Sequence, residues 1–172
     1  MTPSTPVRQP WLALKIPPLA LVALAAAAIW WLPEGWRPPL PPAWRLALGG
    51  LGVLTGALVC LAGVLAFRRA RTTVDPLRPQ AASALVVQGI YRHSRNPMYL
   101  GFALALLGWG LWLAQPGALV VLALFISWLN RYQIAPEEAA LRQRFGGDFD
   151  AYAAQVPRWL GRPFRSRSAG RR

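Results

Sequence analysis

The fold of this chain is decided by residues 99–134, which read YLGFALALLGWGLWLAQPGALVVLALFISWLNRYQI. Two apolar runs, Tyr99 to Ala114 and Ala118 to Ile134, are separated only by residues 115–117, whose Gln-Pro-Gly composition is typical of a tight turn. Both runs approach the roughly 20 helical residues that cross a hydrocarbon layer of ~30 Å. The stretch therefore predicts an antiparallel helical hairpin whose two open ends lie on one face of a membrane.

Two further apolar runs precede this hairpin. The run from Trp44 to Phe67 has no charged residue after Arg45 and is long enough to span a bilayer with some tilt. The run from Trp11 to Leu32 is weaker because it contains Lys15 and two prolines, and a cleaved signal peptide is its competing interpretation. Since 55% of the 172 residues are hydrophobic and only 15% are charged, the composition disfavours a water-soluble domain of ordinary surface. We expect an all-α polytopic membrane protein with about four transmembrane helices.

Glycines recur along the second and third runs, at positions 49, 52, 56 and 63 and again at 101, 108 and 110. Helices in lipid pack without much hydrophobic driving force, so small residues mark the places where two backbones approach closely. The spacing of Gly52 and Gly56 therefore predicts a tight helix contact. The lone Cys60, in the middle of its run, is expected to serve packing.

The formal net charge of +13 comes from arginines that border the apolar runs. Six lie between Arg68 and Arg95 and nine from Arg131 to the C-terminus, whereas residues 33–43 contain one. The positive-inside rule explains this bias more simply than binding to nucleic acid, and it predicts that both termini are cytoplasmic. The expected parts are an N-terminal segment with two transmembrane helices (1–67), a core ending in a cytoplasmic helical segment (68–161) and a basic tail (162–172).

Polar motifs flank the hairpin on its predicted cytoplasmic side. They read ALVVQGIYR (84–92), RNPMYLG (95–101), PEE (136–138), FGG (145–147) and VPRW (156–159). In this order and spacing, the blocks resemble the isoprenylcysteine carboxyl methyltransferase and phospholipid methyltransferase superfamily of integral membrane enzymes. The resemblance covers residues 72–159, and the combination of blocks carries it, because any single block is a weak signal.

The resemblance implies a cytoplasm-facing site for S-adenosylmethionine, formed by the loop before the hairpin and the helix after it, and it implies no metal. The positions that match the family's cofactor-binding blocks are Ser83, Ala84, Leu85, Val86, Tyr91, Asn96, Pro97, Met98, Tyr99, Glu137 and Glu138. Many members have histidine at Asn96, so a proton-handling role does not transfer, although the amide can still hydrogen-bond the cofactor. A family arginine that handles the substrate falls near Gln133, and Arg131 is its nearest substitute. The candidate catalytic residues are therefore Arg95, Asn96 and Arg131.

The chemistry of methyl transfer agrees with these residue types. An in-line displacement at a sulfonium needs alignment and exclusion of water, an effect of about 7–11 kcal/mol, rather than a covalent catalyst. The cofactor's carboxylate, ammonium, sulfonium and adenine match, in turn, Arg95 or Arg92, Glu137, the rings of Tyr91 and Tyr99, and Leu85 with Val86. The hairpin should bring residues 96–99 close to the two glutamates. The glutamates then need cations beside them, and Arg92, Arg95 or Arg131 are the expected partners.

Two of these features also have simpler interpretations. Pro136 followed by two acids is what the start of any helix looks like. Phe145, Phe149, Tyr152 and Val156 recur near helical spacing around the glycine break, which favours amphipathic helices held on the membrane surface, where they also cover the site.

The function that we expect is methyl transfer to a lipophilic acceptor that enters from the bilayer. The acceptor is an isoprenylcysteine-like carboxylate, a phospholipid amine or a small hydrophobic molecule, so the expected partners are this substrate and membrane lipid. The departures at Asn96 and Gln133 leave an alternative, a non-catalytic membrane scaffold or assembly factor that kept the fold. A transporter is disfavoured, because the predicted spans show no buried ion pair and no internal repeat.

Overall fold

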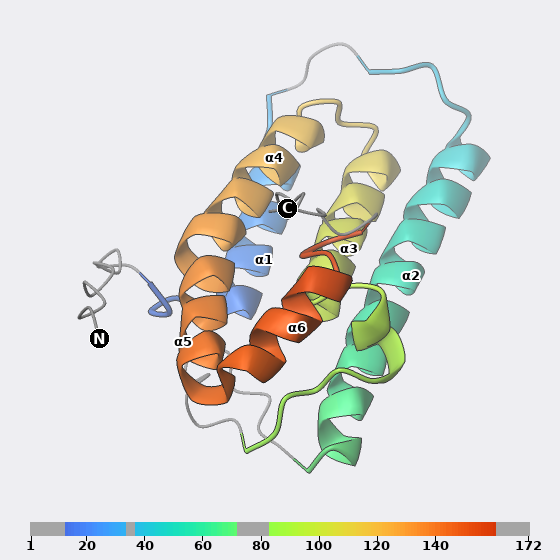
Figure 1. Cartoon of the computed structure of the whole chain (residues 1–172). Coiled ribbons are helices and arrows are strands. Elements are labelled where there is room, and N and C mark those ends of the chain that lie inside the picture. The colour runs from blue at the N-terminus through green and yellow to red at the C-terminus, as the bar shows by residue number, and fades with distance from the viewer. Residues whose placement is uncertain (1–12, 34–36, 72–82, 161–172) are drawn as a thin grey trace, which may run out of the picture.

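The computed structural model describes residues 13–33, 37–71 and 83–160, and these are helical without any strand. The elements are α1 (Pro18–Trp30), α2 (Pro42–Arg69), the 3-10 turn η2 (Gly89–Arg92), α3 (Pro97–Trp112), α4 (Ala118–Trp128), the π-helical turn η3 (Leu129–Ile134), α5 (Ala135–Phe145) and α6 (Gly147–Gln155). Figure 1 shows α1, α2, α3 and the rod formed by α4 and α5 running alongside one another, with α6 folded back across them. The prediction of an all-α fold is confirmed.

Two helices are long and apolar enough to cross a bilayer, judged by length and composition. They are Pro42–Arg69 and the continuous helix Ala118–Phe145, each of 28 residues, with mean hydropathies of 2.2 and 1.5 over their most apolar windows. The helices α1 and α3 are apolar but shorter, at 13 and 16 residues. Large apolar side chains of α2 face outward, as Leu51 (61% exposed) and Leu58 (56%) illustrate. Such a surface is what a helix presents to lipid rather than to water.

The tight turn predicted between α3 and α4 is present. After α3, Ala114 takes a positive φ of 50°, and the N–H of Gln115 donates to the carbonyl of Gly110 at 3.0 Å. This left-handed ending closes the helix and satisfies one of its free carbonyls. The turn lies at the same end of the bundle as residues 37–41, while the C-terminal end of α2 and the corner between α5 and α6 lie at the other (Figure 1).

Helices α2 and α3 pack through the predicted glycines. A Cβ built on Gly56 would lie 2.7 Å from the amide nitrogen of Ala105 and would collide with the carbonyl oxygen of Gly101. A Cβ on Gly52 would lie 2.7 Å from the Cα of Gly108. Backbone meets backbone at these points, so the predicted close contact is confirmed.

The single arginine near the start of α2 caps the neighbouring helix. Arg45 donates from Nε (3.2 Å) and Nη2 (3.0 Å) to the carbonyl of Trp112, the last residue of α3. A helix C-terminus has carbonyls without intrahelical partners and carries partial negative charge, so a guanidinium there is favourable.

The helix α5 continues α4 instead of starting after a loop. Pro136 lies in the first turn of α5, as the motif predicts, but Ile134 before it already has helical angles (φ −70°, ψ −47°). Proline has no N–H to donate to the carbonyl four residues back, which is that of Tyr132. The N–H of Leu14 donates to this carbonyl at 3.0 Å. The proline is thus accommodated within one rod by the π-helical turn and by the segment before α1.

The apolar residues of α6 pack against the protein. Phe149 is 1% exposed and Val156, just after the helix, is 7% exposed. Gly146 makes the corner between α5 and α6, with a φ of 53° that favours glycine. Phe149 and Val156 therefore contact the protein bundle. This corrects the prediction that they hold α6 on the membrane surface.

Candidate functional site

The open end of the hairpin brings the two polar blocks together. Tyr99, in the first turn of α3, donates its hydroxyl hydrogen to Oε2 of Glu137 in the first turn of α5, at 2.9 Å. The side chain of Gln133 also hydrogen-bonds this tyrosine. Tyr99 is only 5% exposed, so the pair is held inside the bundle. The predicted meeting of residues 96–99 with the acid pair is confirmed.

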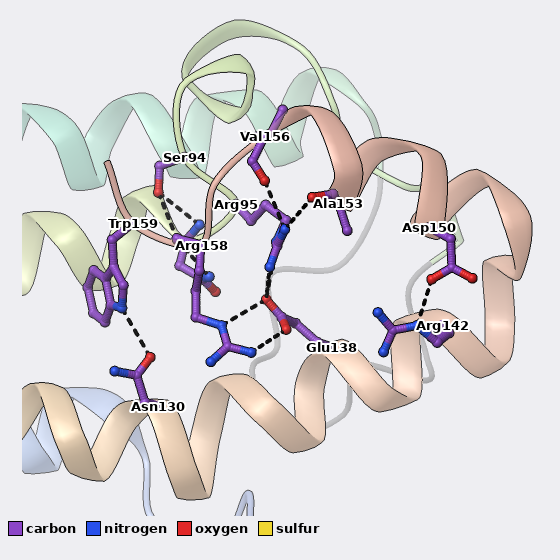
Figure 2. Close-up of polar contacts among 11 residues, drawn as sticks. Ser94, Arg95, Asn130, Glu138, Arg142, Asp150, Ala153, Val156, Arg158 and Trp159 are labelled. Carbon is purple, nitrogen blue, oxygen red and sulfur yellow. Dashed lines mark hydrogen bonds and ion pairs between the residues drawn. The ribbon is translucent and has the colours of Figure 1, made fainter. Parts of the chain in front are cut away.

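The second acid, Glu138, is held by two arginines. Arg95 donates from Nε (3.2 Å) and Nη2 (2.9 Å) to Oε1, while Arg158 donates from Nε to Oε1 (3.2 Å) and from Nη2 to Oε2 (2.6 Å). Figure 2 shows both guanidiniums converging on this one carboxylate. Arg95 is one of the partners predicted for the acid pair, and that prediction is confirmed. Arg158 was not predicted, although its VPRW block was noted.

Residues 153–159, which we call the C-terminal strap, are bound to the segment just before α3. The bonds run from Arg95 Nη1 to the carbonyls of Ala153 and Val156 (both 2.8 Å), from the Arg95 N–H to the Pro157 carbonyl (2.9 Å), and from Asn96 Nδ2 (3.0 Å) and Ser94 Oγ (3.2 Å) to the Arg158 carbonyl. The strap also reaches η3, because Trp159 Nε1 donates to Oδ1 of Asn130 at 3.0 Å. The side-chain amide of Asn96 is thus engaged by the protein itself.

The adjacent acids therefore have different surroundings. Glu138 is neutralised by two cations, whereas Glu137 makes no ion pair with any of the described residues and receives the Tyr99 hydroxyl instead. A partly buried carboxylate without a neighbouring cation is costly unless a positive group binds it. Glu137 is the acid suited to a cationic ligand.

Tyr91 packs beneath this cluster, between α2 and α6. Its ring meets that of Phe67 edge-on, with 5.4 Å between centroids, and its carbonyl accepts a hydrogen bond from the hydroxyl of Tyr152 at 2.8 Å. Burial raises the pKa of both phenols, and the charge of Glu137 raises the pKa of Tyr91 further. Both phenols therefore remain neutral, and the ring of Tyr91 lies near Glu137.

A groove of about 380 Å³ runs between the end of α2 and the segment before η2. Its lining comprises Ala66, Arg69, Ala70, Leu85, Val86, Val87, Gln88 and Gly89. Leu85 and Val86, predicted to contact the adenine, both line this groove, and their cofactor role stays a prediction. The motifs did not indicate Arg69, the last residue of α2. The sequence pattern of this helix suggested only packing.

Several other predicted residues lie outside the polar cluster. Ser83 is exposed and donates to the carbonyl of Arg71 at 3.5 Å, and Ala84 beside it is half-buried. Pro97 and Met98 serve the α3 interface: Pro97 is buried, and a Cβ on Gly63 would lie 2.6 Å from Cγ of Met98.

Arg131 also lies outside the cluster. It is exposed, with its guanidinium 5.6 Å from the ring centroid of Tyr132. The catalytic role assigned to it stays a prediction.

Sequence comparisons identify related proteins. The family model described as phospholipid methyltransferase matches residues 44–148. A protein from Haemophilus influenzae without an assigned function is 43% identical over 63 residues, which are 37% of this chain and all of that protein. Protein-S-isoprenylcysteine O-methyltransferase B from Arabidopsis thaliana is 28% identical over 128 residues (74% of this chain, 64% of that protein). A probable protein-S-isoprenylcysteine O-methyltransferase from Oryza sativa subsp. indica is 30% identical over 120 residues (69% and 63%).

This chain thus spans under two thirds of the length of these two plant proteins. No solved structure matches it.

Proposed function

Because this chain belongs to the phospholipid methyltransferase family, we propose that it is an integral membrane enzyme that transfers a methyl group from S-adenosylmethionine to a lipophilic acceptor. The family match and the plant relatives support methyl transfer as the reaction class. The observation that carries the proposal is Glu137, a carboxylate with a phenol but no cation beside it, at the point where both polar blocks meet.

The residues present fit the cofactor. Glu137 offers an anion to the ammonium, Tyr91 and Tyr99 offer rings to the sulfonium, and the groove offers an apolar slot with Arg69 as a cation. The groove volume of about 380 Å³ falls within the range of pockets for small ligands. Bound there, S-adenosylmethionine would supply a methyl group already activated by the sulfonium. The protein's own contribution is to orient the ligand and exclude water.

The acceptor is proposed to enter from the bilayer. Exposed apolar side chains lie on α2 and α4, such as Leu58 (56% exposed) and Leu124 (66%), and they form surfaces that a lipid-soluble molecule can contact. An isoprenylcysteine-like carboxylate, a phospholipid amine and a small hydrophobic molecule all meet this description. A carboxylate needs no strong base, which agrees with a site built without histidine among the described contacts.

The proposed topology has four spans in the cell membrane, with both termini in the cytoplasm. Its support is the distribution of charge along the bundle. Arg68 and Arg69 lie in the last turn of α2, and this end of α2 is opposite the turn between α3 and α4 (Figure 1). The positive-inside rule places that arginine-rich end in the cytoplasm. The proposed cofactor site then faces the cytoplasm.

Titration calorimetry of the purified protein in detergent tests the proposal. We expect the wild type to bind S-adenosylmethionine and Glu137→Gln to bind about tenfold more weakly or worse, because a hydrogen bond to a charged group contributes about 1.5–3 kcal/mol. The matched control is Asp148→Asn, which neutralises an exposed acid of α6 and should leave the affinity unchanged.

Equal affinity of Glu137→Gln and wild type would refute the site assignment. A wild type that binds no cofactor at millimolar concentration would refute the enzyme and favour the scaffold.

A further inference from the structure

We infer that the C-terminal strap is a working part of the site and that Arg158 is a positioning residue, which holds Tyr99 and Glu137 in register without touching the ligand. The inference rests on the proposed function, because the pair that it positions is the proposed cofactor-binding pair. The strap lies in the part of the chain beyond residue 148, where the family match ends.

Arg158 joins the two halves of the site through opposite ends of the same residue. Its guanidinium binds Glu138, which adjoins Glu137 on α5, through bonds of 3.2 and 2.6 Å. Its carbonyl accepts hydrogen bonds from Asn96 and Ser94, the residues that lead into α3 and its Tyr99. The strap thus adds a tie between the start of α3 and α5, beside the direct bonds from Arg95 to Glu138 and from Tyr99 to Glu137.

Many of the polar groups of this network bind one another. The guanidinium of Arg95 donates Nε and Nη2 to Glu138 and Nη1 to two strap carbonyls. The carboxylate of Glu138 receives two guanidiniums and is 8% exposed as a residue. The inference therefore assigns a positioning role to Arg95, Asn96 and Glu138, which the motifs suggested as catalytic or cofactor-binding groups.

The geometry also explains why a small movement of the strap matters. Asn96 lies three residues before Tyr99, and Glu138 is the chain neighbour of Glu137. If Asn96 or Glu138 loses its bonds, Tyr99 or Glu137 can move, and the 2.9 Å bond between these two residues is weakened. A displacement of about 1 Å in a positioned group can cost about 100-fold in rate. Loss of the Arg158 guanidinium releases the strap from Glu138, and a looser strap holds Asn96 and Ser94 less firmly through the Arg158 carbonyl.

Three variants test the inference. Arg158→Met keeps an unbranched apolar stem without the guanidinium, and Arg158→Lys keeps the charge without the planar fork. The control, Asp150→Asn, breaks the exposed ion pair with Arg142, which also joins α5 to α6. The measurements are the affinity for S-adenosylmethionine at a temperature well below unfolding, and amide hydrogen exchange across residues 94–99.

We expect Arg158→Met to weaken cofactor binding about tenfold or more and to speed exchange at residues 94–99. The variant removes the side-chain link between the strap and Glu138, and it thereby loosens the strap whose Arg158 carbonyl holds Asn96 and Ser94. Arg158→Lys should recover part of both losses, and Asp150→Asn should match the wild type. If Arg158→Met does not fold, the lysine variant carries the test through the same two readouts.

Faster exchange with unchanged affinity would overturn the inference, because the strap would then be merely structural. Unchanged exchange would also overturn it. Failure of the proposed function is a separate result, recognised by the wild type alone when it binds no cofactor.

Discussion

Replacing Glu138 with glutamine should destabilise the protein substantially, although the change removes only a charge. The carboxylate is paired with Arg95 and Arg158, whose side chains are 15% and 36% exposed, and it is itself 11% exposed. Breaking a buried pair by removing one partner costs about 3–5 kcal/mol, because a charge is left unpaired. The partial exposure of Arg158 reduces its share through hydration, so we expect a loss near the lower end, about 3 kcal/mol. For a chain of this size, that loss lowers the melting temperature by about 6–12 °C.

The assay is thermal unfolding of the purified protein in detergent, and the control is Asp150→Asn. The pair between Asp150 and Arg142 has side chains 58% and 51% exposed, and exposed pairs contribute at most about 1 kcal/mol. The control should therefore melt within about 4 °C of the wild type. If Glu138→Gln melts together with the control, the network around Glu138 is hydrated and weak, and the reasoning about its burial is refuted.

Two further substitutions probe other parts of the account. Gly56→Leu should prevent α2 and α3 from packing, since even a Cβ there collides with the Gly101 carbonyl, and loss of folded protein in size-exclusion chromatography would show it. A folded, active Gly56→Leu would contradict this contact. Arg131→Gln should lower turnover and leave cofactor affinity unchanged, because Arg131 is exposed and lies outside the polar cluster. Turnover equal to the wild type would remove Arg131 from the proposed acceptor site.

The hairpin and the contact at its open end were within reach of the sequence. A turn of three residues forces two apolar helices to pack antiparallel. Tyr99 and Glu137 are therefore brought together, although 38 residues separate them. The tight packing at Gly56 was equally accessible, because only glycine allows such a backbone contact. These features follow from short-range covalent and steric constraints.

The role of Arg158 was not accessible in this way. Its partners Ser94 and Asn96 are 64 and 62 residues away, and α6 reaches them only because Gly146 turns the chain back at the end of α5. The direction in which α6 returns depends on the burial of Phe149 in the bundle. The local sequence pattern is the same for a helix that packs on the bundle and for one that lies on a membrane surface.

The junction before Pro136 shows a different limit. Proline followed by acids is typical of a helix start, and the sequence offers no sign that the preceding residues are already helical. The structure keeps one rod because a π-helical turn and the N–H of Leu14 accommodate the proline. The sequence did not indicate that Arg69 lines a groove for a related reason. An arginine at the end of an apolar run is already explained by the positive-inside rule, and only the structure shows the groove beside it.

The most direct test of the central claim is transfer of the methyl group itself. Membranes containing the wild-type protein, the Glu137→Gln variant or no protein are supplied with S-adenosylmethionine labelled in its methyl group, and label is measured in the organic extract. The account predicts a labelled lipophilic product with the wild type and a strongly reduced yield with Glu137→Gln. Equal label in the extracts from wild-type and protein-free membranes would contradict it.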